Sequence, residues 1–212
     1  MATDWVTISA LATAGGTLVL AVATFSSVRS ANRAARAAER SLLAGLRPLL
    51  MPSRLKDPAE KVSFNDGHWI RVDGGHAVVE VADDAIYLAI ALRNVGSGIG
   101  VLHGWRLLDH RPSGEVAQPD PKGFRRLTRD IYVPAGDTGF WQGAFRDPAD
   151  PAFAAARDAA HARADVTVDL LYGDHEGGQR TISRFSMIPI DGGGWLATVG
   201  RHWSLDRADP RR

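Results

Sequence analysis

The chain has 212 residues, of which 45% are hydrophobic and 23% charged, and this size suits one medium domain or one small domain with an appendage. Its 25 Lys and Arg balance 24 Asp and Glu, which excludes a generally basic nucleic-acid-binding protein, so no nucleic-acid partner is expected. The absence of cysteine excludes disulfides, a thiol nucleophile and any cysteine-ligated metal site.

The N-terminal segment predicts a transmembrane helix. Residues 5–28 form a run of 24 amino acids without a charged side chain. At ~1.5 Å per residue this helix is about 36 Å long, enough to cross a hydrocarbon core of about 30 Å. Its Ser and Thr hydroxyls can bond back to helical carbonyls, which makes them tolerable in lipid. Trp5 begins the run, at the position of an interfacial aromatic belt.

Two alternatives remain open for this anchor, which we expect to cover residues 1–28. The tripeptide Ala21-Val22-Ala23 fits the cleavage site of a secretory signal peptide, although no basic residue precedes the apolar run. The segment could also be a buried core helix, although it is long for one.

A basic helical stalk is predicted over residues 29–47. This stretch is rich in alanine and free of proline until Pro48, so the helix should continue to about Leu46. Spacings of four, three and four residues place four arginines on one face: Arg29, Arg33, Arg36 and Arg40. They form either a solvated face or a membrane-proximal strip that contacts anionic headgroups. The alanines, together with the small pair Ala12 and Gly16, would also permit a parallel homodimer.

The charges that flank the apolar run predict its orientation. The N-terminal side carries only Asp4, whereas residues 29–47 hold five arginines and one glutamate. The positive-inside rule then places the C-terminal bulk in the cytoplasm. We therefore expect a single-pass protein of the cell membrane, with the lipid bilayer as its first partner.

Beyond the stalk, the pattern changes from a helical period to alternation, which predicts a β domain over residues 48–205. The clearest strand covers residues 85–95. Other strands are expected at residues 49–51, 68–72, 76–82, 99–109, 132–135, 138–145, 166–172, 180–190 and 195–203. The sequence DGG at residues 73–75 predicts a hairpin turn between its two neighbouring strands. An alanine-rich helix is expected over residues 151–164, and a polar tail over residues 206–212.

About eight strands with closely spaced turn signals predict a mainly β fold, a β-sandwich with one inserted helix. The runs AIYLAIALRNVGSGIG, VPAGDTGFW and VTVDLLYGD resemble bacterial immunoglobulin-like domains of the cell-adhesion-related type. The shared features are an Asn-x-Gly-x-Gly strand end and a later Pro-x-Gly turn, here Asn94, Gly96, Gly98, Pro134 and Gly136. The whole chain resembles bacterial single-pass membrane proteins, themselves uncharacterised, with an anchor, a stalk and such a domain. The resemblance to the immunoglobulin-like domains covers about residues 48–190. It implies an immunoglobulin-like fold and a binding or spacer role, without an activity.

Sequence motifs for catalysis and cofactor binding are absent. The glycines of GSGIG at residues 96–100 do not fit G-x-G-x-x-G and precede a strand, which indicates a turn. The seven histidines form neither H-x-x-x-H nor H-E-x-x-H, and G-x-S-x-G is missing. We therefore assign no catalytic, cofactor-binding or metal-binding residue, expect no cofactor, and expect that the protein is not an enzyme.

Two groups of residues are candidates for a contact surface. Asp174, His175 and Glu176 lie between two strands, where adjacent side chains point in opposite directions, so a solvated loop tip is favoured over a metal site. The five tryptophans of the β domain are expected mostly in the core: Trp69, Trp105, Trp141, Trp195 and Trp203. Trp141 or Trp195, which lie in glycine-rich surroundings, is the candidate for an exposed aromatic residue at a partner surface.

The sequence favours a membrane-anchored, non-enzymatic interaction or scaffolding module with a protein partner. One alternative is a membrane-tethered hydrolase or metal-dependent enzyme that uses the Asp174-His175-Glu176 loop and the pair Asp109-His110. The other is an envelope or surface binding module, which would follow from the reversed topology.

Overall fold

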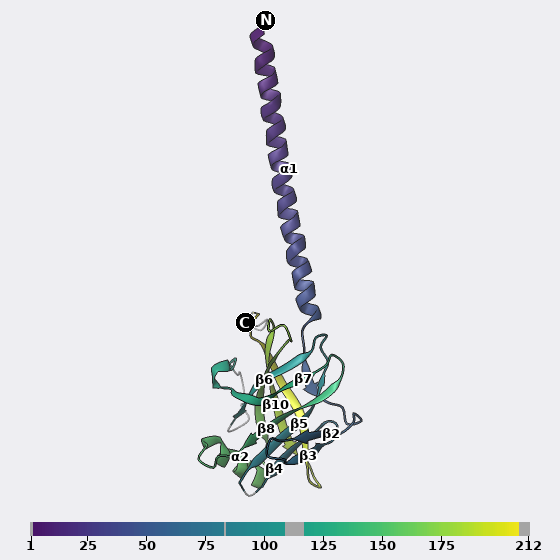
Figure 1. The fold of residues 1–212 in the computed structure, drawn as a ribbon, viewed down its shortest axis with the longest axis vertical. Helices are drawn as coiled ribbons and strands as arrows, with labels where there is room; N and C mark the ends of the chain where they lie inside the picture. The colour runs from purple at the N-terminus through teal and green to yellow at the C-terminus, as the bar shows by residue number, and fades with distance from the viewer. Residues whose placement is uncertain (1, 83, 109–116, 208–212) are drawn as a thin grey trace. The chain divides into compact units, whose positions relative to one another are not determined.

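The computed structural model describes residues 2–82, 84–108 and 117–207. The chain divides into two units, a helical N-terminal unit up to Ala44 and a second unit from Gly45 that holds the β domain (Figure 1). Both units follow from the change in hydrophobic period that the sequence shows after the stalk.

Helix α1 (Ala2–Gly45) runs without interruption through the apolar segment and the predicted stalk. It ends three residues before Pro48, because a residue that precedes proline is disfavoured in the helical conformation. Hydroxyl groups in the apolar segment donate to carbonyls one turn earlier, as predicted: Thr13 to Ser9 at 2.9 Å, Thr17 to Thr13 at 2.8 Å, and Thr24 to Leu20 at 2.8 Å. These bonds satisfy polar groups within the helix, as a hydrocarbon environment requires.

The apolar side chains of α1 are exposed. Each large hydrophobic residue from Trp5 to Val28 is more than half exposed. The stretch Asp4–Gly45 is long and apolar enough to cross a membrane, with a mean hydropathy of 1.9 in its most apolar window, and none of that window is buried. The alternative of a buried core helix is therefore not supported.

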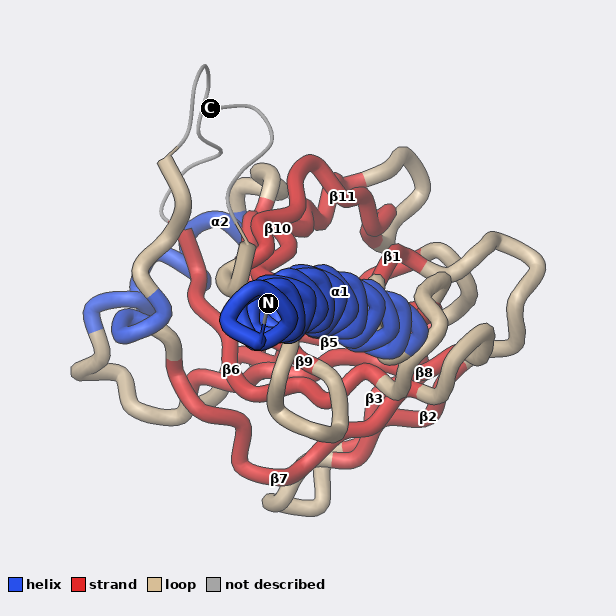
Figure 2. Tube along the Cα trace, turned by 90° about the horizontal axis from the view of Figure 1, so that it is seen from above, coloured by secondary structure: helices blue, strands red, loops and turns tan. Residues whose placement is uncertain are grey.

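The β domain is built on one antiparallel sheet of nine strands. Hydrogen-bonded neighbours follow the order β1-β5-β4-β11-β10-β9-β6-β7, and β8 pairs with β5. The bounds are β1 (Leu50–Pro52), β4 (His76–Val81), β5 (Ile86–Asn94), β6 (Gly100–Leu108), β7 (Arg125–Val133), β8 (Thr138–Phe145), β9 (Val166–Gly173), β10 (Arg180–Pro189) and β11 (Trp195–Ser204). The sheet curls on itself, so that its end strands β7 and β8 approach each other without a ladder between them (Figure 2).

The mainly β prediction is confirmed, but the immunoglobulin-like sandwich is not, because nine strands join into one curled sheet instead of two facing sheets. The hairpin predicted around residues 73–75 is wrong. Strand β3 (Trp69–Val72) pairs with β2 (Glu60–Ser63) in a separate two-stranded sheet, while β4 pairs with β5 and β11. Strand β2 is unexpected because Val62 is the one apolar residue in EKVS.

Strand β5 divides the hydrophobic core into two clusters, and the predicted alternation of its side chains is confirmed. One face lies in the main core within the curled sheet: Ile86, Leu88, Ile90 and Leu92. The opposite face packs beneath the β2–β3 hairpin: Tyr87, Ala89 and Ala91. Because both faces of β5 are buried, its sequence reads as a nearly continuous apolar run.

Helix α2 (Pro151–His161) confirms the helix predicted between the strands, although it ends three residues earlier than expected. Proline occupies its first turn, and the Asp150 carboxylate caps it by accepting a hydrogen bond from the N–H of Ala152 at 3.0 Å. Phe153 and Ala156 carry the buried face into the main core. A short 3-10 helix, η1 (Pro121–Gly123), precedes β7.

The glycine-rich loop after β5 receives the segment that leaves α1. The N–H groups of Ser97 and Gly98 donate to the Arg47 carbonyl at 3.0 and 3.4 Å. A Cβ at Gly98 would overlap the backbone carbonyl of Leu46. Gly98 therefore serves a close approach of two backbone segments, and the predicted turn is confirmed.

Candidate functional site

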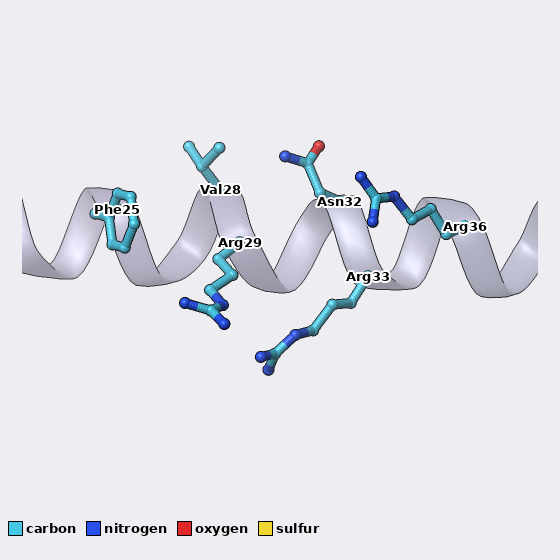
Figure 3. Close-up of a pocket in the computed structure, with 6 residues that line it drawn as sticks. All are labelled: Phe25, Val28, Arg29, Asn32, Arg33 and Arg36. Carbon is cyan, nitrogen blue, oxygen red and sulfur yellow. The ribbon is translucent and has the colours of Figure 1, made fainter.

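The arginine strip of α1 consists of four exposed residues, Arg29, Arg33, Arg36 and Arg40. At 3.6 residues per turn they fall within an arc of about 60°. Figure 3 shows Phe25 and Val28 at the N-terminal end of this face and the first three arginines beyond them, with Asn32 alongside. Apolar side chains thus give way to guanidinium groups within about two turns, which is the order of layers at a membrane surface.

The Asp174-His175-Glu176 loop is the turn between β9 and β10. The Asp174 carboxylate is buried and closes this turn, accepting hydrogen bonds from the N–H of Gly178 at 2.8 Å and from Gln179 Nε2 at 3.4 Å. His175 and Glu176 are exposed, with Nε2 and Oε1 3.3 Å apart. The predicted contact surface at this tip therefore loses Asp174, because its carboxylate holds the loop backbone.

The described residues contain no group of three His, Asp or Glu side chains that could hold a metal ion. The pair Asp109-His110, on which the enzyme alternative also depends, lies outside the described residues. The Ser183 hydroxyl lies 2.5 Å from His202 Nδ1 and 2.8 Å from the Tyr172 hydroxyl, but Ser183 is fully buried. This arrangement therefore links strands β9, β10 and β11 without exposing a nucleophile.

The tryptophans of the β domain lie mostly in the core, as expected, and neither Trp141 nor Trp195 is the exposed aromatic residue of a contact surface. Trp141 is fully buried in the main core, and Trp195 is 4% exposed with the Arg163 guanidinium 5.6 Å from its ring centroid. Gly143, two residues after Trp141, makes room for two indole rings. A Cβ at Gly143 would lie 2.8 Å from the Trp141 ring and 3.0 Å from that of Trp105. These two indoles meet edge to face, with centroids 5.4 Å apart.

The exposed tryptophan lies on the β2–β3 hairpin instead, at a position that was not predicted to be exposed. Trp69 is 56% exposed, and the Lys61 ammonium lies 4.8 Å from its ring centroid. Ile70 and Val72 point into the core from the same strand. The alternation within WIRV is the signal that could have placed Trp69 on the outer face.

A buried ion cluster links three strands of the main sheet. The fully buried Asp169 carboxylate on β9 accepts hydrogen bonds from Arg184 Nε at 2.7 Å on β10, and from Arg106 Nη2 at 2.7 Å on β6. The Arg184 guanidinium also lies 5.0 Å from the ring centroid of Trp203. Both carboxylate oxygens are occupied, so the cluster is a structural link and offers no free acid.

One concave site of the β domain is a hollow of about 140 Å³ where β7 and β8 diverge; we call it the β7–β8 hollow. Three arginines line it, Arg125 and Arg126 from β7 and Arg146 from the end of β8, and no carboxylate does. Arg125 pairs with Asp150, with Nη2 to Oδ1 at 2.7 Å. Arg126 is exposed and has no ion pair with a described residue. The hollow is therefore cationic.

The third arginine of the hollow is fixed by Asp66, in the loop of the β2–β3 hairpin. The Asp66 carboxylate accepts hydrogen bonds at 2.8 Å from Arg146 Nε and from the Tyr87 hydroxyl, and at 3.1 Å from the N–H of His68. Partial burial raises the pKa of Asp66, but these three bonds and the Arg146 charge outweigh it and hold the pKa at about 2.

Removal of this carboxylate should flatten the acid side of the stability profile. Since the folded pKa of Asp66 lies below its usual 3.8, its stabilising contribution is present above about pH 4 and is lost as the pH falls towards 2. We expect the free energy of unfolding of Asp66→Asn to fall less steeply over this window than that of the wild type. Urea denaturation at several pH values, with Arg146→Gln as a second variant that should flatten the profile too, measures this effect. Parallel profiles for wild type and Asp66→Asn would contradict it.

Comparison with known proteins finds no matching family model, no matching curated protein and no matching solved structure. We therefore infer the function of the protein from the helix, the arginine strip and the surface of the β domain.

Proposed function

We propose that the protein is a membrane-anchored, non-enzymatic interaction module, with α1 as a single-pass anchor and the β domain in the cytoplasm. The observation that carries this proposal is α1 itself, an unbroken helix of 44 residues whose apolar part is exposed. Exposed apolar surface on this scale is unfavourable in water and favourable in a bilayer.

The arginine strip supports both the depth and the orientation of the anchor. Guanidinium groups that begin where the apolar run ends suit the headgroup layer of a cytoplasmic leaflet, which carries anionic lipid. The proposal thus includes contact between these arginines and anionic lipid. A parallel homodimer through Ala12, Gly16 and the alanine-rich stalk is a further part of it.

The likeness to immunoglobulin-like domains of the cell-adhesion-related type also belongs to the proposal. The residues that carry it lie together around one side chain. Asn94 Nδ2 donates to the carbonyls of Gly98 at 2.6 Å and Val133 at 3.0 Å, and the N–H of Gly136 donates to the Asn94 carbonyl at 2.9 Å. This amide therefore joins the two turns of the motif, and a binding role would follow from the likeness.

Membrane extraction and reporter fusions test the anchor and its orientation. We expect the full chain to resist alkaline extraction, and a C-terminal reporter to be active only in its cytoplasmic form. Replacing the four arginines of the strip with glutamine should weaken this orientation, because they supply the charge bias. Glutamines at four exposed basic residues of the β domain are the matched control and should leave the orientation unchanged: Arg71, Lys122, Arg126 and Arg157.

The contrary outcomes are distinct. Release of the chain by alkaline extraction would overturn the anchor. A mature chain that lacks residues 1–23 would show a signal peptide cleaved after Ala23. Activity of the exported reporter alone would place the β domain outside, as an envelope or surface binding module.

A further inference from the structure

We propose that the β7–β8 hollow binds an extended acidic peptide segment of a partner protein, which adds to the open edges of β7 and β8. This inference rests on the proposed role as an interaction module and names the surface and the chemistry of the partner.

The main sheet is open between β7 and β8. In the described chain β7 pairs only with β6, and β8 only with β5, so each strand presents one unpaired edge to the other. The two strands are close at their turn, where a Cβ at Gly139 would lie 3.0 Å from the Val133 side chain, and the hollow opens further along. Unpaired strand edges offer N–H and C=O groups to an added strand, which is the basis of peptide binding by β-augmentation.

The side chains that line the hollow carry positive charge. Arg125 and Arg126 approach the hollow from β7 and Arg146 from just after β8, and the described residues that line the hollow include no acid. Asp150 and Asp66 pair with two of them from outside the lining, which fixes their guanidinium groups in place, and no described residue forms an ion pair with Arg126. A carboxylate in the hollow would form charge-assisted hydrogen bonds with the Arg126 guanidinium.

The lining of the hollow also includes a buried hydrogen-bond acceptor, on Gln142. Gln142 lines the hollow and is 5% exposed, yet its Oε1 has no hydrogen-bond partner among the described residues. A buried acceptor without a donor is costly, and a peptide N–H would satisfy it. An anion without a proton, such as sulfate, would bring charge but no such donor, whereas a peptide brings both an acidic side chain and N–H groups.

The volume of the hollow also limits what it can hold. A hollow of about 140 Å³ is small beside the ~300–1,000 Å³ of sites that enclose a whole small molecule. It has room for one side chain, and the Trp105 ring contributes an apolar wall. One acidic side chain of an extended segment, held by backbone pairing on both sides, fits these dimensions.

Fluorescence anisotropy with the full chain in zwitterionic nanodiscs tests the inference. The probe is a labelled peptide of alternating Val and Thr with one central Glu, beside matched peptides with central Gln or Lys. We expect the Glu peptide to bind at least about tenfold more tightly than the Lys peptide, and Arg126→Glu to weaken it by about tenfold or more. Arg157→Glu, an exposed arginine on α2 outside the hollow, is the matched control and should change binding less than about twofold.

Hydrogen exchange on the same complex tests the strand pairing. We expect the amides of residues 126–128 and 143–145 to be protected when the Glu peptide binds. Equal affinity for the three peptides, no effect of Arg126→Glu, or unprotected amides would overturn the inference. Displacement of the peptide by millimolar inorganic phosphate, with phosphate binding equally sensitive to Arg126→Glu, would also overturn it by showing a simple anion site.

These failures differ from failure of the proposed function. Arg126 has no part in membrane insertion, so extraction and topology would be unaltered if peptide binding failed. Conversely, a chain released by alkaline extraction could still bind the peptide, which would leave the inference intact without the anchor.

Discussion

Replacing Asp169 with asparagine is expected to lower the free energy of unfolding of the β domain by about 3–5 kcal/mol. Asp169→Asn keeps the shape of the side chain but removes the negative charge between Arg106 and Arg184. Arg184 is 7% exposed, so its guanidinium cannot recover the lost interaction from water without a rearrangement of β10. The cost arises from buried positive charge left without compensation, and it need not equal the net contribution of the ion cluster to stability.

Urea denaturation of the full chain in detergent micelles, followed by tryptophan fluorescence, measures this loss. Asp73→Asn is the matched control, because its partner Arg71 is 78% exposed and such pairs contribute little. Adding Arg184→Met to Asp169→Asn should restore part of the stability, since it removes one of the two unpaired charges. Equal losses in Asp169→Asn and Asp73→Asn would show that the arginines are compensated elsewhere.

Much of the β domain could be predicted from the sequence because long strands have a visible period. In β5, consecutive residues such as Ile86 and Tyr87 enter different clusters, and the large aliphatic side chains at every second position mark the face in the main core. The pairing of strands could not be predicted in the same way. Strand β3 pairs with β2, which precedes it, and not with β4, which follows it. The period of a strand carries no information on which strand edges pair.

The candidate sites show the same division. The arginine strip could be predicted because its residues share one helix, whose geometry fixes their common face. The β7–β8 hollow could not, because Arg126 and Arg146 come from different strands and meet only when the sheet curls. The ion cluster of Asp169 could not be predicted either, because a single acid within the apolar strand VTVDLLYG does not indicate its two arginine partners.

Substitution of Trp141 by alanine is the second change with a large expected effect, a loss of about 3–5 kcal/mol in the free energy of unfolding. Trp141 is fully buried opposite Ile90, and its ring packs against Trp105. Truncation would remove these contacts and leave a cavity that rigid neighbours in the curled sheet cannot fill. Trp69→Ala is the matched control, since Trp69 is 56% exposed, and we expect it to change stability by less than about 0.5 kcal/mol.

A third variant separates the ring from its polar atom. The indole Nε1 of Trp141 is buried without a partner among the described residues, so Trp141→Phe removes an unsatisfied donor while it keeps an aromatic ring in the core. It should therefore cost less than Trp141→Ala, with far-UV circular dichroism as the probe because tryptophan itself is altered. If Trp69→Ala proved the more damaging change, the main core would not lie within the curled sheet, and the glycines beside Trp141 would indicate exposure after all.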